Sequence, residues 1–103
     1  MKRHGMKILI IVMNDGAYGS EVHKLRSEGL PEKGSVFGRP DFAAVARGFG
    51  LEGKTFKSLT DVPKVVEEFA KSGGAAVWDF HVSDKVLSPT IRKAHPQGKH
   101  AKA

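Results

Sequence analysis

Three segments of the chain have the apolar patterns of β-strands. Residues 8–13 form an unbroken apolar run rich in isoleucine, which predicts a strand covered on both faces, as in a parallel sheet. Residues 53–56 predict a brief second strand. Residues 75–82 (AAVWDFHV) alternate in period two, which predicts a third strand with two different faces. Ala76, Trp78, Phe80 and Val82 share one face, where we interpret the two aromatic residues as core, and Val77, Asp79 and His81 share the other.

Three other segments have helical patterns. The first begins near Ser20, whose hydroxyl is a candidate cap, and ends before Gly29. The second opens at Asp41, and its apolar spacing predicts a short buried helix. The third lies within residues 58–73, with Thr60 or Ser58 as its cap and Gly73 as its end. The apolar residues of the second helix are Phe42, Val45, Ala46 and Phe49.

The order strand, helix, helix, strand, helix, strand predicts an α/β fold with a small three-stranded, mainly parallel sheet flanked by helices. Residues 30–40 contain two prolines and two glycines without periodicity and predict a loop. The apolar pattern fades after residue 88. We therefore expect a domain over residues 1–88 and a disordered basic tail over residues 89–103.

Length and composition narrow the class of protein. A chain of 103 residues with 40% hydrophobic and 27% charged residues is typical of one small globular domain. The longest apolar run is too short to cross a bilayer, and no secretory signal pattern opens the chain. The absence of cysteine excludes thiolate catalysis and disulfides and fits a reducing compartment. We expect no membrane partner and a cytoplasmic location.

The net charge of +6 raises the question of nucleic acid. Seven of the seventeen basic residues lie in residues 1–7 and 89–103, where there is no acidic residue, and the rest of the chain is close to neutral. Basic chain ends without interleaved aromatic residues are more typical of solvated tails than of a nucleic-acid surface. Nucleic-acid binding is therefore the least favoured partner class.

The segment NDGAYGSE, residues 14–21, follows the first strand and precedes a helix. Ligands of open α/β sheets bind outside the carboxyl ends of the strands, which is the position of this segment. Its acid and amide side chains could give oxygen ligands to a hard cation, and its glycines could bring backbone amides near a phosphate. An Asx turn that links strand to helix, with glycines that allow positive φ, explains the same residues. Spacing alone leaves both interpretations open.

The segments ILIIVMNDGAYGSEVHKL, GRPDFAAVARGFGLEG, SLTDVPKVVEEFAKSGGAAVWDFHV and SDKVLSP together resemble one known family. They are similar, over about residues 3–90, to the C-terminal part of the thiamine diphosphate-binding domain of enzymes of the acetolactate synthase and pyruvate decarboxylase type. The resemblance implies thiamine diphosphate and Mg²⁺ as cofactors. It also implies that the parent enzymes cleave or form a carbon-carbon bond next to a carbonyl, as in decarboxylation or carboligation of 2-oxo acids.

The resemblance also assigns roles to residues. It implies that the side chain of Asp15 and the backbone carbonyl of Ala17 bind the metal, and that Glu21 has the position of a glutamate used in proton transfer by the decarboxylase branch. Without the resemblance, Glu21 is explained as an acid that stabilises the helix dipole. The cofactor-binding turn implied by the resemblance consists of Asn14, Asp15, Gly16, Ala17, Tyr18 and Gly19.

The sequence departs from the family pattern before this turn. The thirteen residues that precede Asn14 do not contain the Gly-Asp-Gly whose aspartate is the family's other metal ligand. Mg²⁺ favours six oxygen ligands, and one carboxylate and one carbonyl leave its shell incomplete. We therefore expect the chain to be inactive alone.

Three interpretations stay open. The chain is a fragment or truncated form of a larger enzyme, or one subunit of a split enzyme whose partner supplies the missing motif, or a repurposed α/β module that binds or oligomerises without catalysis. In the family, another strand would pair with the strand of residues 8–13. Its absence predicts an exposed sheet edge that pairs with another chain, either a second copy or a complementary subunit.

Overall fold

The computed structural model describes residues 1–96 of the chain. Its three strands are β1 (Leu9–Asn14), β2 (Glu52–Phe56) and β3 (Ala76–His81), and they form one sheet in the order β1-β3-β2. Both strand pairs are parallel, with Ile11 and Lys54 flanking Trp78 in register. The predicted small parallel α/β fold is confirmed, with β3 in the centre and β1 at an edge of the sheet.

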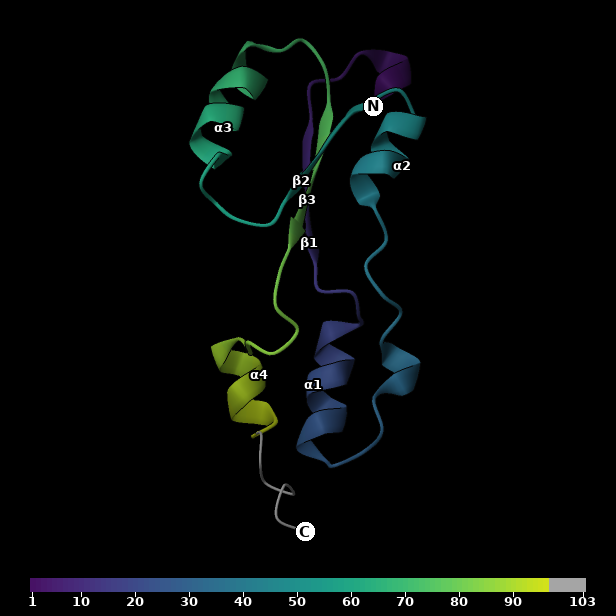
Figure 1. Ribbon diagram of the computed structural model, residues 1–103, viewed down its shortest axis with the longest axis vertical. Coiled ribbons are helices and arrows are strands. Elements are labelled where there is room, and N and C mark those ends of the chain that lie inside the picture. The colour runs from purple at the N-terminus through teal and green to yellow at the C-terminus, as the bar shows by residue number, and fades with distance from the viewer. Residues whose placement is uncertain (97–103) are drawn as a thin grey trace. The chain divides into compact units, whose positions relative to one another are not determined.

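Residues 1–96 also contain four α-helices, which Figure 1 labels, and two short 3₁₀ helices. The six strands and helices predicted from the pattern occur in the predicted order, and the 3₁₀ helices and the last α-helix are additional. The α-helices are α1 (Gly19–Ser27), α2 (Phe42–Gly48), α3 (Val62–Lys71) and α4 (Pro89–Ala94), and the 3₁₀ helices are η1 (Lys2–His4) and η2 (Lys33–Ser35).

The chain divides into two compact units. The first unit consists of Met1–Asn14 and Asp41–Val82 and contains the sheet, α2 and α3. The second unit consists of Asp15–Pro40 and the described residues from Ser83, and contains α1, η2 and α4. The candidate turn therefore begins at the residue where the chain leaves the first unit.

The core of the first unit is aromatic. In Figure 1, α2 and α3 lie on opposite sides of the sheet. Phe56, Val65, Ala76 and Trp78 form the buried cluster on the α3 side, and Phe80 packs against it. The Phe56 ring stacks on that of Phe80 with centroids 4.7 Å apart and meets the Trp78 ring at 5.4 Å. The predicted core role of both β3 aromatic residues is confirmed.

Two predictions about burial are wrong. We expected β1 to be covered on both faces, but Ile11 and Met13 are exposed, because β1 is an edge strand and α2 packs on β2 and β3. We also expected Val45 and Phe49 to be buried, but α2 buries its small residues Ala43 and Ala46. These small residues let the helix approach the sheet closely, and the larger side chains of Val45 and Phe49 are exposed instead.

Among the three helices predicted from the sequence, only α2 has a side-chain cap at its N-terminus. There the side chain of Asp41 accepts a hydrogen bond from the Ala44 N–H at 2.9 Å, as an N-cap does. Helix α1 begins one residue before Ser20 without a side-chain cap, and α3 begins after Asp61 rather than Thr60 or Ser58. Propensity indicates that a helix starts near such residues but does not select among adjacent ones.

The segment predicted as a tail differs from expectation at its start. Residues 89–94 form α4, with Pro89 in its first turn and the Ser88 hydroxyl accepting a hydrogen bond from the Ile91 N–H at 3.2 Å. Ser-Pro is a helix-start signal, and a short helix with one half-buried isoleucine gives too weak an apolar pattern to predict. Residues 97–103 of the predicted tail lie outside the described residues, and the domain boundary at residue 88 stays a prediction.

Candidate functional site

The turn after β1 is an Asx turn. The Ala17 N–H donates a hydrogen bond to Oδ1 of Asp15 at 3.2 Å, two residues along the chain. Gly16 between them has φ of 73°, and a Cβ there would lie 3.2 Å from the Gly38 carbonyl oxygen and 3.0 Å from the Arg39 side chain. Any other residue at position 16 would have a strained backbone, and its Cβ would be crowded by Gly38 and Arg39.

Residues 35–37 hold this turn from one side. Ala17 and Val36 form an antiparallel bridge, in which the Tyr18 N–H donates to the Ser35 carbonyl at 2.9 Å and the Phe37 N–H donates to the Gly16 carbonyl at 3.1 Å. The predicted loop is therefore anchored to the candidate turn. Its anchoring also places the exposed rings of Tyr18 and Phe37 with centroids 5.0 Å apart.

Gly19 makes room for the carboxylate of Asp15. A Cβ at position 19 would collide with Oδ2 of Asp15, so the carboxylate lies directly against the first residue of α1. Oδ1 accepts the hydrogen bond of the turn, and Oδ2 lies against Gly19. The second glycine of the motif therefore leaves the space that this oxygen occupies.

The donor atoms of the turn match a hard cation but are few. The bridge hydrogen bonds use the Gly16 carbonyl and the Tyr18 N–H and do not involve the carbonyl of Ala17. Carboxylate and carbonyl oxygens, such as those of Asp15 and Ala17, are the kind of ligand that Mg²⁺ prefers. Within residues 1–96, no three His, Cys, Asp or Glu side chains gather as a metal site. The chain therefore fits one part of a magnesium shell.

The other two predicted site residues differ in their surroundings. Glu21 lies exposed in the first turn of α1, where its charge complements the helix dipole. Asn14 is the last residue of β1, it is buried, and its carbonyl accepts a hydrogen bond from the Val82 N–H at 3.0 Å. The catalytic role of Glu21 and the cofactor-binding role of Asn14 stay predictions.

A polar pair on β3 was not singled out from the sequence as a candidate site. Asp79 is fully buried, its Oδ2 accepts a hydrogen bond from the Phe42 N–H at 3.1 Å, and Nε2 of His81 lies 3.9 Å from the same oxygen. Oδ1 of Asp79 is buried without a hydrogen-bond partner among the described residues. The sequence offered one signal for this pair, which is a single acidic residue in an otherwise apolar strand. Acidic residues are rarely buried without a partner, so such a residue indicates a polar contact.

An ion-pair network organises the second unit. The guanidinium of Arg26 donates to both carboxylate oxygens of Glu32, at 2.6 and 2.9 Å, and to Oδ2 and the backbone carbonyl of Asp84, at 3.2 and 2.7 Å. The hydrogen bonds from Arg26 lower the pKa of both carboxyl groups, and the bond to Glu32 raises the pKa of Arg26. The network joins α1 to segments six and fifty-eight residues away.

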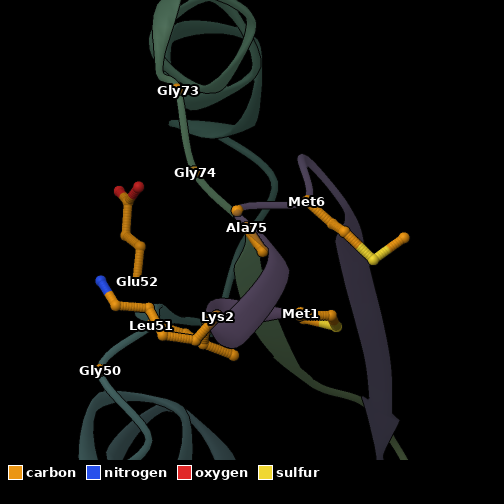
Figure 2. A pocket seen from close by; sticks show the side chains of 10 residues that line it. Met1, Lys2, Met6, Gly50, Leu51, Glu52, Gly73, Gly74 and Ala75 are labelled. Atoms are coloured by element: carbon orange, nitrogen blue, oxygen red, sulfur yellow. The ribbon is translucent and has the colours of Figure 1, made fainter.

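The first unit also has a pocket at the opposite end of its strands from Asn14. It lies where the chain enters β2 and β3, and four of its residues are glycines. Figure 2 shows the charged groups of Lys2 and Glu52 on the same side of this pocket, with the Met6 side chain pointing away from Glu52. It is lined by Met1, Lys2, Gly5, Met6, Gly50, Leu51, Glu52, Gly73, Gly74 and Ala75. Because open parallel sheets bind ligands at the carboxyl ends of their strands, this pocket is not the predicted site.

An open parallel sheet whose first strand leads through an acidic, glycine-containing turn into a helix is typical of α/β domains that bind ligands at this point. The family described as the C-terminal TPP-binding domain of thiamine pyrophosphate enzymes matches residues 1–80. The chain belongs to this family, whose cofactor, thiamine pyrophosphate, is the same compound as thiamine diphosphate. A comparison with curated proteins found no match. No helix in the described part of the chain is long and apolar enough to span a membrane.

Proposed function

We propose that this chain carries one part of a thiamine diphosphate and magnesium site and is inactive on its own. Family membership supports the cofactor, and the turn of residues 15–19 supports the way in which it is held. The observation that carries the proposal is the placement of Asp15, whose carboxylate lies against the start of α1 beside a bridge that leaves out the Ala17 carbonyl.

In this proposal each residue of the turn has a separate task. Asp15 offers Oδ2 and Ala17 offers its carbonyl to Mg²⁺, while Gly16 and Gly19 allow the backbone to approach. Asn14 and Tyr18 would help to hold the diphosphate. When bound, the cofactor supplies the chemistry by which such enzymes cleave or form a carbon-carbon bond next to a carbonyl. Glu21, which is exposed in the first turn of α1, would hold or move a proton.

In this arrangement Mg²⁺ would link the protein to the diphosphate. The turn itself has no lysine or arginine between residues 14 and 21, and the cation would add positive charge beside the Arg39 side chain, which lies next to Gly16. Two protein ligands leave several positions of an octahedral shell to water, phosphate or another chain. Binding by this chain is therefore expected to be weak, and turnover of 2-oxo acids is expected to be absent.

Calorimetric titration of thiamine diphosphate with Mg²⁺ into the chain tests this proposal. We expect weak binding that disappears without Mg²⁺ and disappears in Asp15→Ala. Asp15→Asn keeps the acceptor that the Ala17 N–H needs and should retain only part of the affinity. Asp61→Ala, which removes an exposed carboxylate with no side-chain cap bond, should bind like the parent chain. A folded chain without any Mg²⁺-dependent binding would show that the turn is structural only.

A second candidate function is a subunit of a split enzyme. The position of β1 at the sheet edge favours it, because a partner chain could add the strand and the acidic ligand that the family has there. In this case catalysis appears only on mixing with the partner, in the cytoplasm that the cysteine-free composition predicts. A non-catalytic module, the third interpretation, predicts no cofactor binding in either state.

A further inference from the structure

The pocket at the start of β2 and β3 has no role in the proposed function, because it lies at the opposite end of the strands from Asn14. All of its lining residues belong to the first unit. Its volume is about 340 Å³, near the lower limit for small-molecule sites, so it suits a small ligand rather than a nucleotide or a peptide. The groups that line the pocket indicate the chemistry of that ligand.

Two opposite charges face this pocket without pairing with each other. Figure 2 shows the Lys2 ammonium and the Glu52 carboxylate on the same side of the pocket, and no ion pair joins them in the part of the chain that the structure describes. Glu52 makes a long ion pair with Lys54, in which Oε1 lies 3.6 Å from Nζ, and an exposed pair of this kind contributes little. A ligand with an acidic and a basic group can therefore bind between Lys2 and Glu52 and match both charges.

Packing holds the stem of Lys2 along the pocket. A Cβ at Gly50 would lie 3.5 Å from Cε of Lys2 and 3.8 Å from its Cδ, so the stem lies directly over this glycine. Gly50 has φ of 77°, which favours glycine and keeps that surface free of a side chain. The position of the Lys2 ammonium therefore follows from the packing of its stem rather than from an ion pair.

Two adjacent glycines, Gly73 and Gly74, also line the pocket. Neither has a positive φ, and a Cβ at either position would meet no atom within 4 Å, so backbone conformation and packing do not require glycine there. Both residues are exposed, and within residues 1–96 neither N–H donates to a backbone carbonyl. Successive N–H groups of this kind are donors for an anionic group of a ligand.

We propose that this pocket binds a free α-amino acid with an apolar side chain. The Lys2 ammonium and the N–H groups of Gly73 and Gly74 hold the carboxylate of the ligand, because a carboxylate accepts several hydrogen bonds and favours a charged donor. The Glu52 carboxylate accepts hydrogen bonds from the ammonium group of the ligand. Each charged group of the amino acid then has a partner of opposite charge.

Ligands with a single charge fit this pocket less well. The apolar part of its lining, which includes Leu51 and Ala75, suits the aliphatic chain of an acid, an amine or an amino acid alike. A simple acid would set its charge near Glu52, and a simple amine would set its charge near Lys2. An amino acid avoids both repulsions, and it needs neither Mg²⁺ nor thiamine diphosphate, so this inference does not depend on the proposed function.

NMR titration of the isotope-labelled chain with three small compounds, without Mg²⁺ or thiamine diphosphate, tests the proposal. L-Norvaline carries both charges, pentanoate lacks its ammonium group, and butylamine lacks its carboxylate. We expect saturable shifts at the amides of Gly73 and Gly74 with L-norvaline. Pentanoate and butylamine should bind at least about tenfold more weakly, because each loses the hydrogen bonds of one charged group.

Substitutions test the two charged partners separately. Glu52→Gln and Lys2→Gln each remove a charge-assisted hydrogen bond and should weaken L-norvaline binding by at least about tenfold. Glu67→Gln and Lys64→Gln are matched controls at exposed residues of α3 outside the pocket, and they should bind like the parent chain.

A further variant tests the place of binding. Gly74→Val adds a side chain where φ is not positive and no atom lies within 4 Å of the new Cβ, so the chain should fold but bind L-norvaline more weakly. Three results would overturn the proposal. The first is a folded chain whose pocket amides do not respond to L-norvaline. The second is pentanoate or butylamine binding as tightly as L-norvaline, and the third is unchanged L-norvaline binding in Glu52→Gln, Lys2→Gln or Gly74→Val.

Discussion

The two units of this protein are stabilised by different interactions. The first unit has a sheet with an aromatic cluster of Phe56, Trp78 and Phe80 on one face. The second unit buries Val22 as its fully covered apolar side chain, and its segments are joined by the Arg26 network and the bridge at Ala17. Apolar packing therefore supports the strand that leads to the candidate turn, and polar contacts support the turn itself.

This difference matters for function, because the predicted metal ligands lie in the second unit. Asp15 and Ala17 are positioned by an Asx turn and a two-bond bridge rather than by a core. Polar contacts at a surface contribute little net free energy, and they respond to pH and salt. We expect the geometry of the turn to change under conditions that leave the sheet intact.

The largest expected effect is in the first unit. Trp78→Ala removes the centre of the aromatic cluster and should lower the free energy of unfolding by about 3–5 kcal/mol. Urea denaturation measures this loss of stability. Unfolding is followed by circular dichroism, because the substitution removes the tryptophan fluorophore. Leu59→Ala, at a side chain 72% exposed, should change stability by less than about 0.5 kcal/mol. Equal losses in the two variants would mean that the cluster is not the core.

The next largest effect is a difference in stability between two glycine-to-alanine substitutions in the first unit. A Cβ at Gly53 on β2 would run into the backbone of Ala43 in α2, so Gly53→Ala should destabilise the protein by about 1–3 kcal/mol. Gly48→Ala, at the end of α2, meets no atom within 4 Å and should be neutral or stabilising. Thermal unfolding of both variants measures the difference, and a neutral Gly53→Ala would contradict the close packing of α2 on β2.

A smaller effect should be confined to the second unit. Arg26→Ala removes the cation that Glu32 and Asp84 share. Arg26→Lys keeps the positive charge but cannot make the bidentate hydrogen bonds to the Glu32 carboxylate. Amide hydrogen exchange should become faster in α1, more in the alanine than in the lysine variant, and should not change in β3. Faster exchange throughout the sheet would show that the units do not respond separately.

The smallest expected effect is a dependence on pH. Arg26 lowers the pKa of Glu32 and of Asp84 in the folded chain. Their contribution is therefore fully present above the ordinary carboxyl pKa of about 4 and is lost as the pH falls through the lowered values. Protection factors in α1, which are corrected for the intrinsic pH dependence of amide exchange, should fall in this acidic range in the parent chain, and the fall should shrink in Arg26→Ala. An unchanged fall in that variant would exclude the network as its cause.

The fold could be predicted where one segment carries its own pattern. The alternation of β3 gave the core face with Trp78 and Phe80, and the side chain of Asp41 marked the start of α2. The apolar run of β1 led to the wrong prediction that both of its faces are covered. Burial of a strand depends on the neighbouring elements, and the sequence of a single segment does not specify them. The larger residues of α2 were assigned to the core for the same reason, although Ala43 and Ala46 pack there.

The candidate site could be predicted only in part. The segment of residues 14–21 indicated a turn with oxygen ligands, and the family resemblance, confirmed over residues 1–80, supplied the cofactor. The bridge between Ala17 and Val36 and the contact of Arg26 with Asp84 join residues far apart in sequence, and no local pattern predicts them. The bond from the Phe42 N–H to Asp79 spans thirty-seven residues and was missed for that reason.

The central claim is that the turn of residues 15–19 is a partial magnesium and thiamine diphosphate site. The most direct measurement is a titration of the isotope-labelled chain with Mg²⁺ and then thiamine diphosphate, followed residue by residue by NMR. The account predicts weak, saturable shifts at the amides of Ala17 and Tyr18, with β3 unaffected and Asp15→Ala unresponsive. A well-folded chain whose turn does not respond, or one that responds equally in Asp15→Ala, would contradict it.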